Sequence, residues 1–124
     1  MKTLIAIDTI KNFEDSVTMG RIFKEELSPK SYPIPFLDGG EGTIESMKFI
    51  SKGKYHYVNV HNPLNEAITA RYLLNDGFAT IEMAESSGLS RLYKEDLDVM
   101  NASSLGLGEV ILDALDNGAE SFYG

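Results

Sequence analysis

Carboxylates and glycines gather in one short segment, residues 38–43, whose sequence is Asp-Gly-Gly-Glu-Gly-Thr. Three glycines within four positions let backbone N–H groups approach a ligand closely at the start of a helix. Asp38 and Glu41 add two negative charges there, and the GxxxxGK[ST] pattern of a phosphate-binding loop is absent. The carboxylates suit substrate hydroxyls, a general base, or a Mg²⁺ ion that bridges to phosphates. A glycine-rich turn, with Asp38 as helix cap and Glu41 favouring the helix dipole, fits the same residues.

A second pair of charged residues, Asp8 and Lys11, follows the first apolar run of the chain. Asp8 stands at the carboxyl end of a predicted strand, where open α/β sheets place their ligand crevices. Together the two side chains suit a metal or substrate hydroxyl and a phosphate. The alternative is a helix-entry turn with solvated charges.

Glu82 lies in a predicted strand, immediately before the sequence Ala-Glu-Ser-Ser-Gly at residues 84–88. Carboxylates and hydroxyls near a strand end form a candidate metal or substrate rim, but the pattern by itself favours a solvated strand face. His56 and His61 are five residues apart on another predicted strand. They should point to opposite faces and therefore do not form a metal-binding pair.

The elements that must position the first candidates follow an α/β pattern. Residues 4–7 read as a buried strand of a parallel sheet. A helix follows, with Asn12 as its candidate N-cap, and residues 32–37, which hold two prolines, form an edge or exit strand. A second helix opens near residue 43 and ends before Gly53. The residues expected to face inward from these helices are Phe13, Val17, Gly20, Phe23, Leu27, Ile44, Met47 and Ile50.

The later part of the chain changes to strand periodicity. Residues 55–84 predict three consecutive antiparallel strands, with a two-residue turn at Asp76-Gly77. A helix capped by Ser103 or Ser104 and ended by Asn117-Gly118 follows, and residues 119–123 begin another strand. The inward positions are Ile68, Ala70, Tyr72, Leu74, Ala79, Ile81, Met83, Leu107, Val110, Ile111, Ala114 and Leu115. The chain therefore stops inside a βαβ unit, and an unpaired strand at 121–123 predicts self-association or marginal stability.

Composition narrows the class of protein. The 124 residues suit one domain, and 43% apolar with 24% charged residues is ordinary for a globular protein. A net charge of −8 speaks against binding to nucleic acid or an anionic membrane surface. No apolar run approaches the length of a membrane span or a signal-peptide core. The absence of cysteine excludes disulfides, thiolate metal sites and cysteine nucleophiles. We therefore expect a soluble, cytoplasmic protein.

Several segments in this order resemble the type I family of bacterial glycerate kinases, over essentially the whole chain. The most specific is Asp-Gly-Gly-Glu-Gly-Thr at residues 38–43, combined with Glu-Met-Ala at 82–84 and Ser-Gly-Leu at 87–89. Ile-Ala-Ile-Asp at 5–8, Asn-Pro-Leu at 62–64 and Ser-Leu-Gly-Leu-Gly-Glu at 104–109 also match. Two departures stand out. Asn12 replaces a glycine of the family's first turn, and a glycine-rich run that serves the nucleotide phosphates would follow Gly124.

The resemblance implies ATP- and Mg²⁺-dependent phosphorylation of glycerate, usually to 2-phosphoglycerate. It implies a Rossmann-like α/β domain with a smaller α/β domain inserted, and an active site in the cleft between them. This chain would be the N-terminal third: residues 1–54 a Rossmann-like βαβα start, 55–84 the meander, and 85–124 a linker, a helix and the start of a strand. The implied catalytic residues are Asp8, Lys11, Asp38 and Glu41; the substrate-binding residues Gly39, Gly40, Gly42, Thr43, Ser86 and Ser87; and a metal ligand Glu82.

Two other readings remain open at this point. One is a catalytically inactive fragment that only binds a small hydroxy acid or a partner chain. The other is a phospho-receiver-like signalling domain, which shares the size, the acidity and an Asp after the first strand. The predicted antiparallel meander argues against this last reading.

Overall fold

The chain adopts a mixed α/β fold with one parallel and one mixed sheet. The computed structural model describes residues 3–7, 10, 14–27, 30–88, 92 and 101–124. It divides into two compact units, Met1–Lys52 (unit 1) and Gly53–Gly124 (unit 2). Residues 1–2, 8–9, 11–13, 28–29, 89–91 and 93–100, which include the predicted Asp8, Lys11, Asn12 and Phe13, lie outside the described residues.

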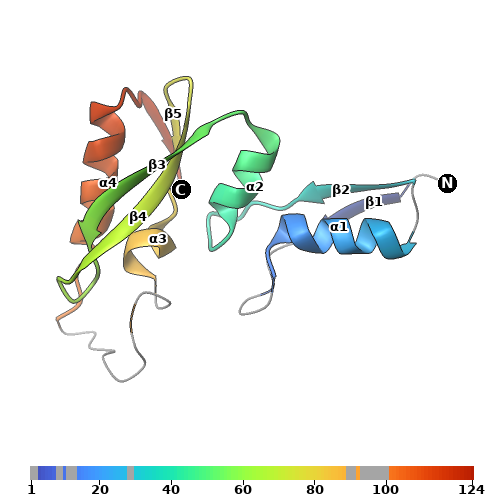
Figure 1. The fold of residues 1–124 in the computed structure, drawn as a ribbon, viewed down its shortest axis with the longest axis horizontal. Helices are drawn as coiled ribbons and strands as arrows, with labels where there is room; N and C mark the ends of the chain where they lie inside the picture. Colours follow the sequence, from blue (N-terminus) through green and yellow to red (C-terminus); the bar gives the residue numbers. More distant parts are fainter. Residues whose placement is uncertain (1–2, 8–9, 11–13, 28–29, 89–91, 93–100) are drawn as a thin grey trace. The chain divides into compact units, whose positions relative to one another are not determined.

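Unit 1 contains β1 (Thr3–Ile7), α1 (Ser16–Leu27), β2 (Ser31–Pro35) and α2 (Thr43–Ile50). The strands β1 and β2 pair in parallel, as predicted, with α1 lying alongside them (Figure 1). The prediction that residues 4–7 are buried is wrong for one face of β1, because Ile5 is buried whereas Leu4 and Ala6 are exposed. The helix α1 begins where Asp15 caps it: the backbone N–H and the hydroxyl of Thr18 donate to the two Asp15 carboxylate oxygens, at 2.8 and 3.1 Å. The cap observed in the described residues is thus Asp15, three residues after the predicted Asn12.

Small residues bring the layers of unit 1 together. A Cβ added at Gly20 of α1 would lie only 2.7 Å from Pro33 Cβ of β2, so helix and strand need glycine there. The hydroxyls of Ser16 and Ser46 are 2.7 Å apart and join α1 to α2 inside the unit. These contacts of glycine and serine take the place of some of the apolar contacts predicted for the two helices. The predicted inward positions Phe23, Leu27 and Ile50 are in fact exposed.

Unit 2 holds a four-stranded sheet in the order β3 (Lys54–His61), β4 (Ala67–Asn75), β5 (Phe78–Thr80) and β6 (Ser121–Tyr123). The strands β3, β4 and β5 are antiparallel neighbours, and both residues of the Asp76-Gly77 turn have positive φ, at 49° and 77°. The third strand ends at Thr80, whereas the sequence predicted strand through residue 84. A short helix α3 (Met83–Ser87) takes its place, and the predicted inward residue Met83 is exposed.

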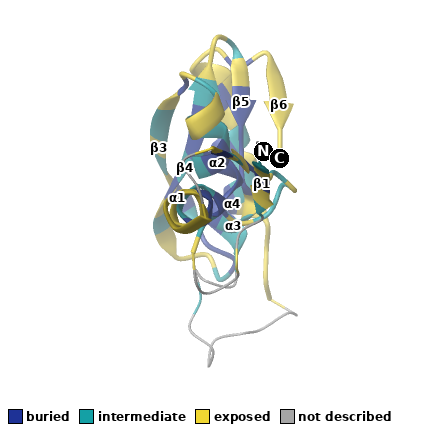
Figure 2. Cartoon of the chain, turned by 90° about the vertical axis from the view of Figure 1, so that its right-hand side faces the viewer, coloured by how far each residue is buried: buried dark blue, intermediate teal, exposed yellow. Residues whose placement is uncertain are grey.

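The core of unit 2 forms between the sheet and α4 (Leu105–Asp116). The N-cap residue of α4 is Ser104, one of the two predicted serines, although its side chain makes no cap hydrogen bond. Ser103 Oγ accepts the Leu105 N–H at 3.1 Å, and Asn117 ends the helix as predicted. Leu115 is exposed, contrary to prediction. Figure 2 shows the burial directly, with β5 dark blue and the outer strand β6 yellow. The buried members of the core are Val60, Ala70, Tyr72, Ala79, Ile81, Val110, Ala114 and Ala119.

The strand β6 is paired, which corrects the expectation of an orphan strand. It runs parallel to β5, with Phe122 opposite Ala79, and the N–H of Ile81 donates to the Tyr123 carbonyl at 2.8 Å. The segments β5, α4 and β6 therefore complete a βαβ unit. Periodicity identified the strand but carried no information about its partner. Within the described residues, no helix combines the length and hydrophobicity needed to traverse a bilayer.

Candidate active site

The loop that joins β2 to α2 carries the segment 38–43, after the carboxyl end of a parallel strand. Asp38 Oδ1 accepts the N–H of Gly40 at 2.8 Å, which folds the carboxylate back onto its own loop. The N-cap of α2 is Gly42, with φ 92°, and no side chain caps this helix. Asp38 is therefore not the helix cap that the alternative interpretation required.

Glycine is needed at two points of this loop. Gly39 and Gly42 adopt φ values of 85° and 92°, a region that other residues rarely enter. The N–H of Thr43 donates to the Gly40 carbonyl at 3.2 Å and closes the turn into α2. Thr43 is only 2% exposed, so its side chain is not part of the solvent-facing surface of the loop, whereas Asp38 is exposed.

The part of the loop that faces solvent presents two carboxylates, Asp38 and Glu41, around a glycine backbone. This donor set fits Mg²⁺, a hard cation that proteins hold through one or two carboxylates while substrate phosphates and waters complete its shell. No group of three or more His, Cys, Asp or Glu side chains suited to a metal occurs among the described residues. The fit therefore extends to a shared site and not to a closed metal cage.

Glu82, predicted on a solvated strand face, is instead buried at 4% exposure at the N-cap of α3. One turn later, Glu85 is also buried and accepts a hydrogen bond from Arg71 Nε at 2.8 Å. The Arg71 guanidinium lies 5.3 Å from the centre of the Tyr55 ring. Burial, with the neighbouring Tyr57 and Glu85 charges, raises the pKa of Tyr55. These contacts fix α3 against β3 and β4.

The two serines at the end of α3 differ in access. Ser86 is fully buried, and its hydroxyl lies 3.3 Å from that of Ser87. A Cβ added at Gly106 of α4 would lie 3.3 Å from Ser86 Cβ, so α4 packs directly on this serine. Of the two hydroxyls, only that of the half-buried Ser87 belongs to a residue that solvent reaches.

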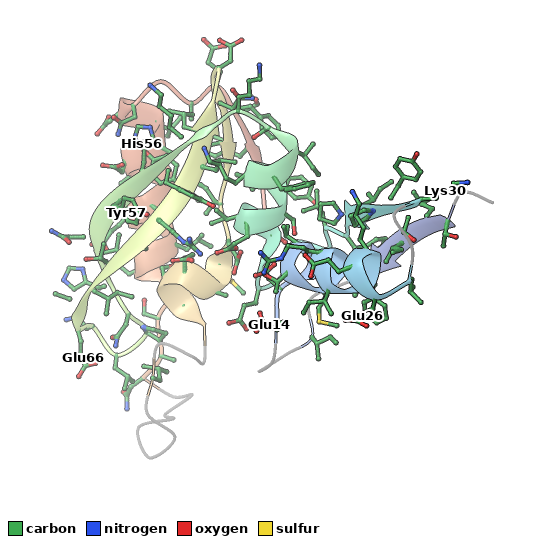
Figure 3. The ribbon with its side chains drawn as sticks, turned by 45° about the vertical axis from the view of Figure 1, so that its right-hand side comes forward. Glu14, Glu26, Lys30, His56, Tyr57 and Glu66 are labelled. Atoms are coloured by element: carbon green, nitrogen blue, oxygen red, sulfur yellow. The ribbon has the colours of Figure 1, made fainter. Side chains whose placement is uncertain are left out.

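The turn between β3 and β4 is built by Asn62, the first residue of the Asn-Pro-Leu segment. Its Oδ1 accepts the N–H groups of Leu64 and Glu66 at 3.0 and 2.9 Å, and its Nδ2 donates to Glu66 Oε2 at 2.7 Å. Figure 3 labels Glu66 at this turn and His56 and Tyr57 on β3. The same end of the sheet contacts the segment that leads into α4, because the N–H of Ser103 donates to the Pro63 carbonyl at 2.9 Å.

Comparison with known proteins supports the resemblance. The Glycerate kinase family profile matches residues 3–123. The chain is 37% identical to the Glycerate 2-kinase of Escherichia coli K12 over 96% of its length, and 36% identical to the Glycerate kinase of Haemophilus influenzae over 98%. A crystal structure from Salmonella typhimurium LT2, of a protein provisionally assigned as glycerate kinase 2, superposes with a TM-score of 0.74 at 34% identity, covering 98% of this chain.

Nearly the whole chain is matched, but only part of each relative is. The chain spans 33% and 34% of the two relatives and 35% of the solved structure. The profile nevertheless covers nearly every residue, and the loop at 38–43 lies inside the matched region. On these grounds the chain belongs to the glycerate kinase family.

Proposed function

We propose that this chain provides the substrate side of a cytoplasmic glycerate kinase, which transfers a phosphoryl group from ATP to glycerate to give 2-phosphoglycerate. The observation that carries the proposal is the loop at 38–43. Asp38 and Glu41 are exposed in this loop, and Gly39 and Gly42 have positive φ. In phosphoryl transfer the protein mainly positions the reacting groups and stabilises the charge of the transition state. A loop of this kind can position a hydroxy acid.

The roles follow from the chemistry of each group. Asp38 or Glu41 orients the glycerate hydroxyls, and one of them accepts the proton from the attacking hydroxyl. The substrate can approach the loop backbone closely because the glycines carry no side chain. Asp8 and Lys11 complete the set: the Lys11 ammonium pairs with the glycerate carboxylate or with the moving phosphoryl group.

Mg²⁺, when bound, neutralises the charge of the ATP phosphates. The exposed carboxylates of the loop suit it, as argued above. Glu82 is a weaker candidate, because it is only 4% exposed and its carboxylate is less accessible than those of the loop. The name of the Escherichia coli relative, Glycerate 2-kinase, supports phosphorylation at the 2-hydroxyl of glycerate.

A second candidate function is binding without turnover. The observation that favours it is length, because the chain spans only about a third of its relatives. In that case the 124 residues bind a small hydroxy acid through the same loop and transfer no phosphoryl group.

Both candidate functions require the loop at 38–43 to bind a hydroxy acid. Calorimetric titration of the chain with D-glycerate tests this binding. We expect saturable binding that weakens at least tenfold in the Asp38→Ala, Glu41→Ala double variant. Glu26→Ala, an exposed change in α1, is the matched control and should bind as the wild type does. If the double variant binds equally well, the loop does not form the substrate site.

A further inference from the structure

The turn between α4 and β6 contains the single Asn-Gly dipeptide of the sequence, Asn117-Gly118. Both residues are exposed, and Gly118 has a positive φ of 94°. A Cβ added at Gly118 would meet no atom within 4 Å, so no side chain or other element packs on the turn at this point. Solvent therefore reaches the peptide bond that joins the two residues.

Hydrogen bonds hold both the side-chain amide of Asn117 and the N–H that follows it. Asn117 Nδ2 donates to the Asp113 carbonyl at 2.8 Å and to Asp113 Oδ2 at 3.1 Å. The same carboxylate oxygen accepts the Tyr72 hydroxyl at 2.8 Å. The Gly118 N–H donates to the Leu115 carbonyl at 3.0 Å. All of these bonds to Asn117 and Gly118 lie in the last turn of α4, and helix ends open more readily than helix centres.

We propose that Asn117 is a site of spontaneous deamidation, and that Asp113 restrains the reaction. When the last turn of α4 opens, the Gly118 nitrogen loses its proton to solvent and forms a bond to Asn117 Cγ. The bond between Cγ and Nδ2 then breaks, and Nδ2 takes up a proton and leaves as ammonia. One water molecule opens the resulting succinimide ring at either carbonyl carbon, which leaves aspartate or isoaspartate at position 117. Glycine favours the ring closure because it has no side chain to restrict the backbone.

The product reverses the interaction with Asp113. A carboxylate at position 117 only accepts hydrogen bonds, so the donor to Asp113 is lost. Two like charges four residues apart on a helix are destabilising, and a negative charge at the C-terminus of a helix opposes its dipole. Isoaspartate also lengthens the main chain by one carbon, two residues before the buried Ala119. Deamidation therefore loosens the junction of α4 and β6, independently of the proposed function.

Peptide mass spectrometry of the full 124-residue chain, incubated in native buffer at neutral pH, tests the inference. The conversion of amide to acid is followed at Asn117 and at Asn75. Asn75 is the matched internal control, because it is also exposed at a turn but is followed by Asp76. We expect Asn117 to deamidate at least tenfold faster than Asn75. Methyl transfer by an isoaspartyl methyltransferase should detect isoaspartate in the peptide that contains position 117.

Two further variants separate the restraint by Asp113 from a general loss of stability. Asp113→Ala removes the carboxylate that holds Asn117 Nδ2 and should accelerate deamidation at least threefold. Tyr72→Phe removes the other hydrogen bond to that carboxylate and should leave the rate within twofold of the wild type. Circular dichroism confirms that each variant is folded.

The effect of the product is measured with Asn117→Asp and Asn117→Ala. Both variants lose the donor to Asp113, but only the first adds the charge. We expect Asn117→Asp to have the lower urea midpoint of the two. Equal midpoints would show that the charge of the product does not loosen the junction of α4 and β6.

Three results of the incubation would overturn the inference. The first is deamidation of Asn117 at the rate of Asn75. The second is deamidation of Asn117 in urea but not in native buffer, which would show that the fold blocks the reaction. The third is an equal rate in the wild type and in folded Asp113→Ala, which would show that Asp113 does not restrain Asn117.

Discussion

The Glu109 carboxylate accepts two hydrogen bonds from His61, one from the backbone N–H at 2.7 Å and one from the ring Nδ1 at 2.8 Å. These bonds lower the pKa of Glu109, the backbone N–H contributing most. An ionised carboxylate only accepts, so His61 Nδ1 carries the proton. The pair joins the end of β3 to α4, 48 residues later in the chain.

The pH dependence of stability should reveal this pair. Because folding lowers the pKa of Glu109 below its ordinary value of 4.5, its contribution is fully present above about pH 4.5 and disappears as the pH falls through the lowered folded pKa. Urea midpoints of Glu109→Gln should therefore lie below those of the wild type at pH 7 and converge with them toward pH 3. Glu120→Gln, an exposed change in unit 2, should track the wild type throughout. A gap that stays constant with pH contradicts this account.

Two glycines in α4 should respond oppositely to alanine. A Cβ at Gly106 would overlap the His61 carbonyl oxygen, whereas one at Gly108 would meet no atom within 4 Å. We expect Gly106→Ala to lower the free energy of unfolding by about 1–2 kcal/mol, as overpacking outweighs the gain in helix propensity. Gly108→Ala should raise it by about 0.5–1 kcal/mol. Equal effects in urea denaturation would show that α4 does not contact β3 in this way.

The buried Tyr72 hydroxyl should contribute measurably to stability. It donates to Asp113 Oδ2 at 2.8 Å, its ring stacks on His56, and burial together with Asp113 strongly raises its pKa. Removing the hydroxyl in Tyr72→Phe should cost about 1–3 kcal/mol, the range for hydrogen bonds to charged acceptors. Tyr57→Phe is the control, because Tyr57 is 67% exposed, and its midpoint should stay within error of the wild type.

The charge of Asp38 can be separated from its structural bond. In Asp38→Asn the side-chain oxygen still accepts the Gly40 N–H, so the loop keeps its turn while the charge is lost. Placed in a complete enzyme, in which these 124 residues replace the matching third of the Escherichia coli relative, we expect this variant to lose at least 100-fold in kcat. Unchanged turnover would remove Asp38 as the base.

Local pattern predicted the elements better than their boundaries. The parallel β1 and β2, the antiparallel β3 to β5 and the caps of α4 follow from periodicity and turn residues, and the structure confirms them. The third strand was predicted too long because the alternation of Ala79, Ile81 and Met83 continues past the point where the backbone turns into α3. Glu82 was consequently placed on a solvated strand face, whereas it is buried.

Long-range contacts could not be predicted from the sequence. The contact of Glu109 with His61 and the pairing of β6 with β5 join residues more than 40 positions apart. Local spacing carries no signal for such pairs. The loop at 38–43 was recognisable because its glycines and carboxylates are adjacent in the sequence. The hydrogen bond between the Gly40 N–H and Asp38, and the burial of Thr43, could be found only in the structure.

The most direct test of the proposed function is ADP release from ATP, D-glycerate and Mg²⁺, measured for the 124-residue chain and for the complete enzyme described above. We predict turnover that depends on glycerate in the complete enzyme and none in the chain alone, with 2-phosphoglycerate identified as product by ³¹P NMR. If the complete enzyme folds and binds ATP but never phosphorylates glycerate, these residues do not form the substrate side of a glycerate kinase. Turnover by the chain alone would contradict the division into a substrate side and a nucleotide side.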